Sequence, residues 1–322
     1  MPAIKDILSG VQKNVSLKDY TTFKIGGRAK YFFVAKSKED LMTAIEAAKS
    51  FKLPIFILGG GSKLLVSDKG FGGLVIKIDI SGVKIKNNEA FVGAGMGLTK
   101  LANFLTGEGL SGLEWAAGIP GGTVGGAIYG HAQAFNIRIS DAVKEVEALD
   151  LKTFKIKKFT KEQCKFSLKN SIFKNPPVGG EKFVIISAVL KFKKEDSDKI
   201  KNKIKEFLQY RKNSHPLDFP SAGSTFVNPE KKIRNKKLLE KFPELNEYNR
   251  RGSVPAGYLI SKCGISGKKI GKAQISEKHA NFIINLGGAK AKDVLALIKL
   301  AKKEVKKTFD IDLEPEVQFV GF

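Results

Sequence analysis

The 322-residue chain has few of the features that mark several protein classes. Its two cysteines, Cys164 and Cys263, are too few and too far apart for a disulfide framework or a cysteine-ligated metal site. We expect both to be small buried side chains, and we expect no metal. No apolar run approaches the roughly 20 residues of a membrane span. The start, MPAIKDILSG, lacks a basic segment followed by an apolar one, so we expect a cytoplasmic protein without a membrane partner.

Arginine is also scarce. The formal net charge of +24 would suit a nucleic-acid-binding protein, because cations that neutralise phosphates supply most non-specific affinity. Only six of the 56 basic residues are arginine, however, and base-reading proteins depend on the bidentate guanidinium. No RRM, KH, helix-turn-helix or zinc pattern is present. We therefore expect no nucleic-acid partner, and we interpret the lysines as a compositional bias that favours anionic substrates.

The chain does contain the alternating apolar and polar patterns of a soluble globular protein, with 42% hydrophobic and 27% charged residues. Its length predicts two or three domains. A cluster of prolines in 215–220 indicates a domain boundary. Periodicity and capping patterns predict helices over 37–51, 98–109, 196–212, 256–264 and 292–309. They predict strands over 55–58, 73–80, 89–95, 144–150, 153–159, 183–192, 279–286 and 312–322. The pattern as a whole is typical of an α+β protein.

Glycine is concentrated in three places. The segment IFILGGGSKLLVSD (55–68) places three glycines directly after a predicted strand, although it matches neither G-x-G-x-x-G nor G-x-x-x-x-G-K-[ST]. Glycine allows backbone amides to approach an anion closely, whereas the alternative is a tight turn between strands. GAGMG (93–97) and the apolar, glycine-rich stretch 112–135 follow. A flexible linker of that glycine content would be polar, so we predict a buried backbone surface that packs against a flat ligand.

Eight blocks of sequence carry a family resemblance. They are TTFKIGGRAKYF (21–32), LGGGSKLLVSDKGF (58–71), GLEWAAGIPGGTVGGA (112–127), KNSIFK (169–174), HPLDFPSAGSTFVNP (215–229), AGYLISKCG (256–264), SEKHANFIIN (276–285) and LEPEVQFVG (313–321). In this order they resemble the UDP-N-acetylenolpyruvoylglucosamine reductase (MurB) family, in its shorter subtype. The resemblance covers nearly the whole chain from about residue 15.

The resemblance implies an enzyme, UDP-N-acetylmuramate dehydrogenase, that acts in peptidoglycan precursor synthesis. In this family NADPH reduces FAD, and the enolpyruvyl ether of UDP-N-acetylglucosamine is then reduced to UDP-N-acetylmuramate. The implied fold is a two-part FAD-binding domain of the PCMH type, similar to vanillyl-alcohol oxidase, followed by a smaller α+β substrate domain. We place the FAD-binding region at 1–212, with subdomains at about 1–78 and 79–212. The substrate domain is expected at 213–309 and a C-terminal strand with the catalytic glutamate at 310–322. We expect a monomer.

The resemblance also assigns site residues. It implies that Ser224 is the proton donor, that Glu316 stabilises the enolate-like intermediate, and that Lys169 is the oxyanion contact. The implied FAD-binding residues are Gly59, Gly60, Gly61, Ser62, Lys63, Gly118, Ile119, Pro120, Gly125, Gly126 and Ala127. The implied substrate-binding residues are Asn228, Tyr258, Lys262, Glu277 and Gln318.

The chemistry explains why such groups are required. Hydride addition to one carbon of an enol ether leaves carbanion character on its neighbour, and that carbon needs a proton. A neutral hydroxyl such as that of Ser224 can supply it only if a cation or a proton chain stabilises the alkoxide. A protonated Glu316 that donates a hydrogen bond would have to be buried. Glu314 is predicted to lie on the same strand face as Glu316.

The chain departs from the family pattern at several of these positions. Lys169 replaces the usual arginine, which keeps the charge but loses the bidentate fork. Lys63 stands where asparagine is common and Gln318 where arginine is common. His131 and Gln133 replace asparagine and glycine, and Gly122 is predicted to be a one-residue insertion.

Alternatives therefore stay open. Ser224 alone would be read as a turn residue, Glu316 as an edge charge and His131 as a packing residue. The chain could be a related FAD oxidoreductase with another substrate, or a non-catalytic nucleotide-binding homologue.

Overall fold

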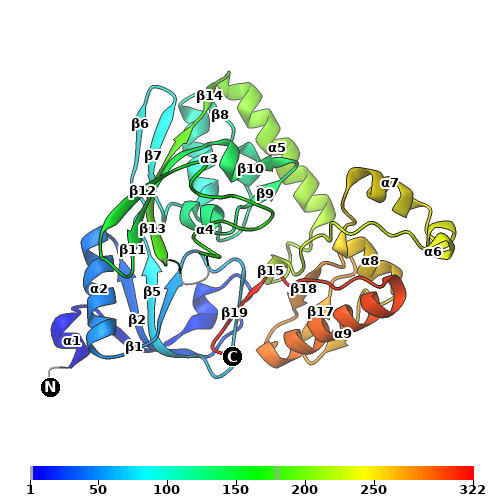
Figure 1. Ribbon diagram of the computed structural model, residues 1–322, viewed down its shortest axis with the longest axis horizontal. Coiled ribbons are helices and arrows are strands. Elements are labelled where there is room, and N and C mark those ends of the chain that lie inside the picture. The colour runs from blue at the N-terminus through cyan, green and yellow to red at the C-terminus, as the bar shows by residue number, and fades with distance from the viewer. Residues whose placement is uncertain (1–2, 178–179, 181) are drawn as a thin grey trace. The chain divides into compact units, whose positions relative to one another are not determined.

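The computed structural model describes residues 3–177, 180 and 182–322, and these divide into two compact units (Figure 1). The first unit comprises Met1–Val15, Ala29–Gly61 and Phe71–Arg211, and the second comprises Ser16–Arg28, Ser62–Gly70 and Lys212–Phe322. The main division thus lies after Arg211, next to the boundary that we placed after residue 212. The second predicted subdomain falls almost wholly in the first unit, whereas the first predicted subdomain is divided between the two units. Two short N-terminal segments and the C-terminal tail belong to the second.

The first sheet of the first unit has the order β1-β2-β5-β3. These strands span Gln12–Ser16 (β1), Arg28–Ala35 (β2), Ile55–Leu58 (β3) and Phe71–Ile78 (β5). Strands β2 and β3 both pair with β5 in parallel. Helix α2 (Lys38–Ser50) joins β2 to β3, and it begins with a capping box in which Ser37 accepts from the Asp40 amide at 3.0 Å. The predicted helix over 37–51 and the predicted strand over 55–58 are confirmed, because the cap begins the helix and Pro54 separates it from the strand.

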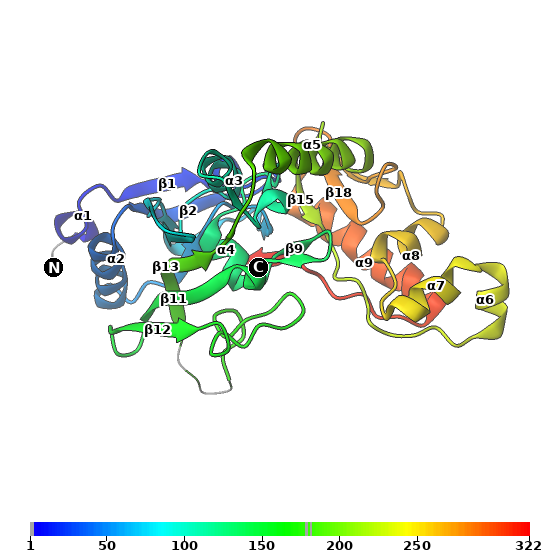
Figure 2. The same cartoon turned by 90° about the horizontal axis from the view of Figure 1, so that it is seen from above.

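The second sheet of the first unit is antiparallel with the order β12-β11-β13-β7-β6, and Figure 2 shows β11, β12 and β13 side by side. Its strands span Val83–Lys86 (β6), Glu89–Gly93 (β7), Val143–Asp150 (β11), Ile156–Thr160 (β12) and Phe183–Lys191 (β13). The longer helices of this unit are α3 (Leu98–Gly107), α4 (Val124–Tyr129) and α5 (Ser197–Ser214). Its short elements are α1 (Ile4–Ile7), β8 (Leu110–Ser111), η2 (Glu114–Ala116), β9 (Gln133–Ala134), β10 (Ile137–Arg138), η3 (Ile139–Asp141) and β14 (Lys193–Lys194).

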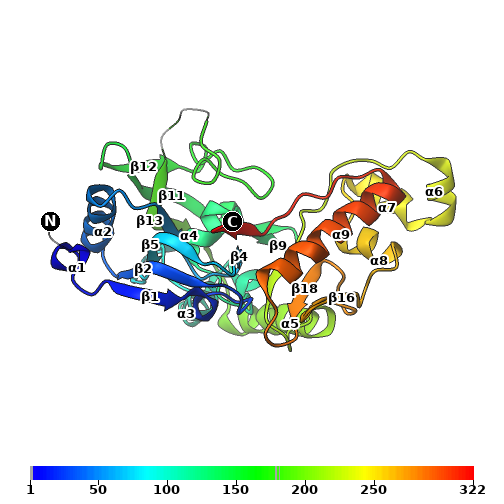
Figure 3. The same ribbon diagram turned by 90° about the horizontal axis from the view of Figure 1, so that it is seen from below.

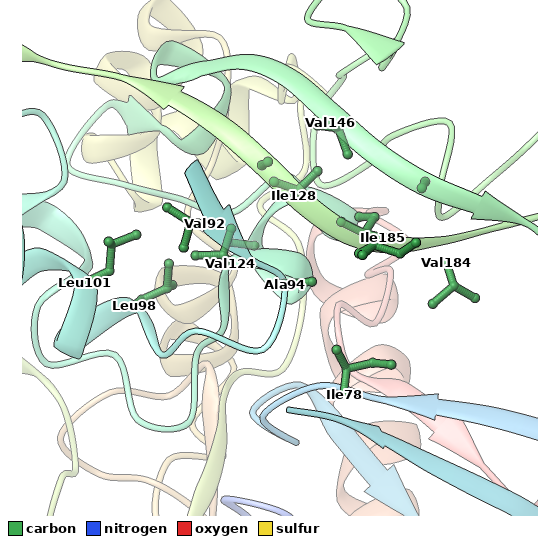
Figure 4. Close-up of a cluster of buried hydrophobic side chains, with 14 of the residues drawn as sticks. Ile78, Val92, Ala94, Leu98, Leu101, Val124, Ile128, Val146, Val184 and Ile185 are labelled. Carbon is green, nitrogen blue, oxygen red and sulfur yellow. The ribbon is translucent and has the colours of Figure 1, made fainter. Parts of the chain in front are cut away.

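Apolar side chains from both sheets and their helices form one continuous core in the first unit. Figure 4 shows part of it, where Ile78 from β5 lies below Ala94, Val184 and Ile185, and Leu98 from α3 lies beside Val92. Cys164 is fully buried in this core, and burial raises the pKa of its thiol to about 12. Its prediction as a small buried side chain is confirmed, whereas Cys263 is half-buried.

The second unit is built on the antiparallel sheet β15-β18-β17-β16. Its strands are β15 (Ser221–Ser224), β16 (Lys269–Ile270), β17 (Ala273–Ile275) and β18 (Phe282–Asn285). Its helices are η1 (Leu17–Tyr20), α6 (Lys236–Lys241), α7 (Glu244–Arg251), α8 (Ala256–Lys262) and α9 (Ala291–Phe309). Figure 3 shows α9 alongside α8, and apolar residues of both helices belong to this unit's own core.

The C-terminal tail differs from its prediction as one strand over 312–322. Only Gln318–Val320 (β19) form a strand, and they pair in parallel with β4 (Leu64–Val66). Earlier in the tail, Pro315 makes an isolated antiparallel bridge with Phe226. The Val227 amide donates to the Glu314 carbonyl and the Glu316 amide donates to the Thr225 carbonyl, so both glutamates lie in this antiparallel pairing. The tail changes its partner between Glu316 and Gln318.

No helix within residues 3–177, 180 and 182–322 is long and apolar enough to cross a membrane.

Candidate active site

The three glycine clusters of the sequence meet in the first unit. A Cβ built on Gly60 would overlap the carbonyl oxygen of Gly121, so the first and third clusters touch backbone to backbone. Gly61 has φ +70°, which favours glycine. A Cβ on Gly125 would lie 2.8 Å from that of Ala94, which joins the third cluster to the second. The predicted glycine surface is thus a single assembly of bare backbone.

Hydrogen bonds fix this assembly. The Leu98 amide donates to the Gly122 carbonyl at 2.9 Å, and the Gly125 amide donates to the Ala94 carbonyl at 2.8 Å. The Thr123 hydroxyl accepts from the Gly126 amide at 3.3 Å and begins α4. Gly122, which we interpreted as an insertion, is therefore part of the pairing between the clusters.

Two buried donors lie beside the predicted FAD-binding residue Gly118. Arg211 donates through Nη2 to the Trp115 carbonyl at 2.9 Å, and its Cδ lies 3.6 Å from the position that a Cβ on Gly118 would take. Within the described part of the chain, Arg211 Nε and Trp115 Nε1 are buried without a hydrogen-bond partner. Unpaired buried donors are costly, so these two atoms fit a polar acceptor that FAD would supply.

This pair was not among the predicted site residues. Arg211 is one of only six arginines in a lysine-rich chain, and Trp115 is the only tryptophan, which were the available signals. Of the other predicted FAD-binding residues, Ile119 is half-buried, Pro120 is exposed and Ala127 is buried in the core.

Lys169 occupies the tip of a tight turn in the first unit. Ser167 and Asn170 exchange two backbone hydrogen bonds of 3.1 Å each, and Lys169 between them has φ +53°. This left-handed conformation is uncommon for a lysine, so the surrounding bonds must hold it. The Lys174 ammonium donates to the Lys169 carbonyl at 2.9 Å.

His131 anchors the same turn. Its Nδ1 donates to the Ser167 carbonyl at 2.5 Å, and its Nε2 accepts from the Ser140 hydroxyl at 2.8 Å. The ring stacks on Phe166 with centroids 4.8 Å apart. Burial lowers the pKa of His131, and the nearby charges of Arg138 and Lys169 act in the same direction. Among the described residues no group of three or more His, Cys, Asp or Glu side chains could hold a metal.

The pH dependence of stability tests the state of His131. Because its folded pKa lies below its ordinary value of about 6.5, the unfolded chain binds more protons as the pH falls through that value. Stability is therefore expected to be complete above about pH 6.5 and to fall below it. His279, whose pKa burial also lowers, contributes in the same direction. Urea unfolding at pH 7.5 and 5.5 should show a smaller loss in His131→Asn than in the wild type, and equal losses would contradict the assignment.

In the second unit the tail places Glu316 next to Ser224 and Lys63. The Glu316 amide donates to the Thr225 carbonyl at 2.8 Å, which sets Glu316 beside the end of β15. Two residues later the Gln318 amide donates to the Lys63 carbonyl at 2.8 Å, at the start of the pairing of β19 with β4. The change of pairing partner in the tail thus brings Lys63, β15 and the glutamate together within the second unit.

The side chain of Lys63 joins the other two residues. Its ammonium lies 3.1 Å from Glu316 Oε1 and donates to the Ser224 carbonyl at 2.8 Å. The Glu316 side chain is only 12% exposed, whereas that of Lys63 is 36% exposed. Gly223 precedes Ser224 with φ +70°, a left-handed conformation that favours glycine, and a Cβ there would be in ordinary van der Waals contact with the ammonium at 3.5 Å.

A buried asparagine, which was not among the predicted site residues, holds the backbone of the two residues that follow Ser224. Asn281 accepts from the Phe226 amide at 2.9 Å and donates to the Phe226 carbonyl at 2.9 Å. Its own carbonyl accepts from the Thr225 amide at 2.7 Å. The position of this polar residue within the apolar run HANFIIN was the only signal in the sequence.

Four of the predicted substrate-binding residues lie on α8 or on segments near it, whereas Gln318 begins β19 beside Lys63. Asn228 Oδ1 accepts from the Ala256 amide at 3.0 Å, where α8 begins. Tyr258 donates to Glu244 at 3.1 Å, and Lys262 lies 3.4 Å from the same carboxylate. Glu277 is exposed, with its side chain over Gly267.

Comparisons with known proteins agree along the whole chain. The family model "UDP-N-acetylenolpyruvoylglucosamine reductase, C-terminal domain" matches residues 215–320, and "FAD binding domain" matches residues 29–157. The UDP-N-acetylenolpyruvoylglucosamine reductase of Caldicellulosiruptor bescii is 40% identical over 318 residues, covering 97% of this chain and 92% of the relative. That of Bacillus subtilis is 36% identical over 313 residues, covering 97% and 94%.

A solved structure gives the same result. The crystal structure of UDP-N-acetylenolpyruvylglucosamine reductase (MurB) from Thermus caldophilus aligns with a TM-score of 0.74 and 31% identity, covering 96% of this chain and 98% of that one. The predicted resemblance and the predicted fold, an FAD-binding domain followed by the C-terminal domain of these reductases, are confirmed. The chain belongs to the UDP-N-acetylenolpyruvoylglucosamine reductase family.

Proposed function

We propose that this chain reduces the enolpyruvyl ether of UDP-N-acetylglucosamine to UDP-N-acetylmuramate in peptidoglycan precursor synthesis, as a cytoplasmic monomer that uses NADPH and FAD. Family membership supports the reaction. The observation that carries it is the contact of the Lys63 ammonium with both the Glu316 carboxylate and the main-chain carbonyl of Ser224, because it joins a carboxylate and a cation to the residue that we propose as proton donor.

FAD, when bound, accepts a hydride from NADPH and passes it to the substrate. The glycine assembly around Gly60 and Gly121 suits the pyrophosphate, since bare backbone amides can approach it closely. Arg211 and Trp115 would donate to polar atoms of the cofactor. We propose that the remaining predicted FAD-binding residues, with the exception of Lys63, line the same cofactor site.

The role that we give to Ser224 is to protonate the carbon next to the substrate carboxylate. Loss of the hydroxyl proton creates an alkoxide, which a nearby positive charge stabilises. The Lys63 ammonium supplies such a charge, and its ion pair with the Glu316 carboxylate, at 3.1 Å, keeps it in place. Asn228, Tyr258, Lys262, Glu277 and Gln318 are proposed to bind the nucleotide substrate, with Tyr258 and Lys262 held by Glu244.

Lys169→Arg tests the proposed oxyanion contact. Arginine keeps the positive charge and adds a bidentate fork, so we expect activity that equals or exceeds that of the wild type. Lys169→Met should lose roughly 100- to 1,000-fold in the rate of substrate reduction, the scale of one lost oxyanion donor. Lys165→Met, an exposed lysine in the same loop that also has a positive φ, is the matched control. A large loss in Lys169→Arg would show that the pocket is built for lysine alone.

Steady-state turnover tests the proposed substrate. NADPH oxidation is expected with the enolpyruvyl nucleotide and not with UDP-N-acetylglucosamine, and mass spectrometry should identify a product two hydrogens heavier than the substrate. NADPH consumption without that product would refute the proposed function.

A further inference from the structure

The cation at the centre of the second unit's cluster comes from an unexpected position. Lys63 follows the glycine run, where the resemblance led us to expect an asparagine and a contact with the FAD pyrophosphate. Its ammonium instead contacts two residues on other segments: the carboxylate of Glu316 at 3.1 Å and the main-chain carbonyl of Ser224 at 2.8 Å. One side chain thus connects the Glu316 carboxylate to the main chain of Ser224, the residue to which we give the protonation chemistry.

The backbone on either side fixes this connection. Lys63 is held through its carbonyl by the Gln318 amide, and Glu316 is held through its amide by the Thr225 carbonyl. The backbones that carry the ammonium and the carboxylate are therefore each held by a hydrogen bond of the C-terminal tail. An ion pair with a largely buried carboxylate is not a mobile surface contact, for which solvent screening would remove most of the effect.

The charge at this point matters for the reaction. When Ser224 gives up its proton, negative charge develops on a residue whose main-chain carbonyl is bound to the same ammonium as the Glu316 carboxylate, and like charges in one cluster disfavour that step. The Lys63 cation that both residues share offsets the repulsion and stabilises the alkoxide. An ammonium that is already paired with a carboxylate attracts a phosphate less strongly than a free one.

We propose that Lys63 is a positioning residue for proton transfer: it fixes Glu316 relative to Ser224 and neutralises the carboxylate while the Ser224 hydroxyl is deprotonated. This inference rests on the proposed function. It gives the departure from asparagine at position 63 a role in the protonation step and not in holding FAD.

The experiment compares Lys63→Met, Lys63→Arg and the exposed control Lys69→Met as FAD-loaded proteins. Anaerobic stopped-flow measures flavin reduction by NADPH and then flavin reoxidation by the enolpyruvyl nucleotide. Lys63→Met should slow reoxidation by roughly 100-fold, the scale of the loss when a catalytic group is displaced by about 1 Å. Flavin reduction and the FAD dissociation constant should stay within about twofold of the wild type. Lys63→Arg should recover most of the lost rate, because it keeps the charge.

The solvent isotope effect on reoxidation provides a readout that a structural defect would not change. It should increase in Lys63→Met, since proton transfer then limits the rate more strongly, and remain at the wild-type value in Lys69→Met. Wild-type reoxidation in Lys63→Met would overturn the inference. If FAD binding were weaker at the same time, the result would favour a phosphate contact of Lys63 instead. Failure of the nucleotide to reoxidise the wild-type flavin would instead refute the proposed function itself. If Lys63→Met does not fold, loss of the reoxidation rate in folded Lys63→Arg would contradict the charge-based role.

Discussion

Ser224→Ala is expected to slow flavin reoxidation by the enolpyruvyl nucleotide by roughly 100- to 10,000-fold, the range that a positioned general acid contributes. Flavin reduction by NADPH should remain within about twofold of the wild type, because that step needs no proton from the serine. The substitution removes only the hydroxyl. The contact of Lys63 with residue 224 is made through the main-chain carbonyl, so alanine retains it.

The matched control for this variant is Ser221→Ala, on the same strand β15. Its hydroxyl accepts from the Gly223 amide at 3.3 Å, so its loss reports any general effect of loosening the strand. We expect it to change reoxidation far less than Ser224→Ala. Equal losses of both half-reactions in Ser224→Ala would contradict its role as proton donor.

Gly60→Ala is expected to reduce the unfolding free energy by about 1–3 kcal/mol and to abolish tight FAD binding. A methyl group at this position would overlap the Gly121 carbonyl, which is backbone and cannot rotate away. Thermal unfolding with and without FAD measures both effects, since ligand binding to the folded state alone raises the Tm.

Gly72→Ala is the control for that experiment, because a Cβ on Gly72 meets no atom within 4 Å. It should change the unfolding free energy by no more than about 0.5 kcal/mol. A Gly60→Ala variant with wild-type Tm and FAD affinity would contradict the requirement for backbone contact between the glycine clusters.

Much of the fold could be predicted from local sequence signals. The capping pattern at Ser37 and Asp40, together with Pro54, located α2 and β3, and the long amphipathic pattern located α9. Helices α6 and α7 were missed, because they are short, highly charged and contribute only Leu245 to the fully buried core. Their stability depends on packing and capping in the folded unit more than on their own periodicity.

The candidate site could be predicted only in part. Ser224 and Glu316 followed from the family resemblance, and their roles remain proposals. The ion pair of Lys63 with Glu316 could not be predicted. It depends on the parallel pairing of β4 with β19, and these strands lie far apart in the sequence, at 64–66 and 318–320. The same pairing places Ser62–Gly70 in the second unit, so the division between the units falls directly after Gly61, within the glycine loop. The link between His131 and the Lys169 turn is likewise a tertiary contact without a local sequence signal.

The most direct test of the account is the oxidative half-reaction of the wild-type protein. The FAD-loaded protein, reduced with NADPH under anaerobic conditions, is mixed with the enolpyruvyl nucleotide while flavin absorbance is recorded. The account predicts rapid return of the oxidised flavin spectrum with formation of one equivalent of UDP-N-acetylmuramate. A flavin that stays reduced until oxygen is admitted would contradict it. That result would favour an oxidoreductase with another substrate, and a flavin that NADPH cannot reduce would favour a non-catalytic homologue.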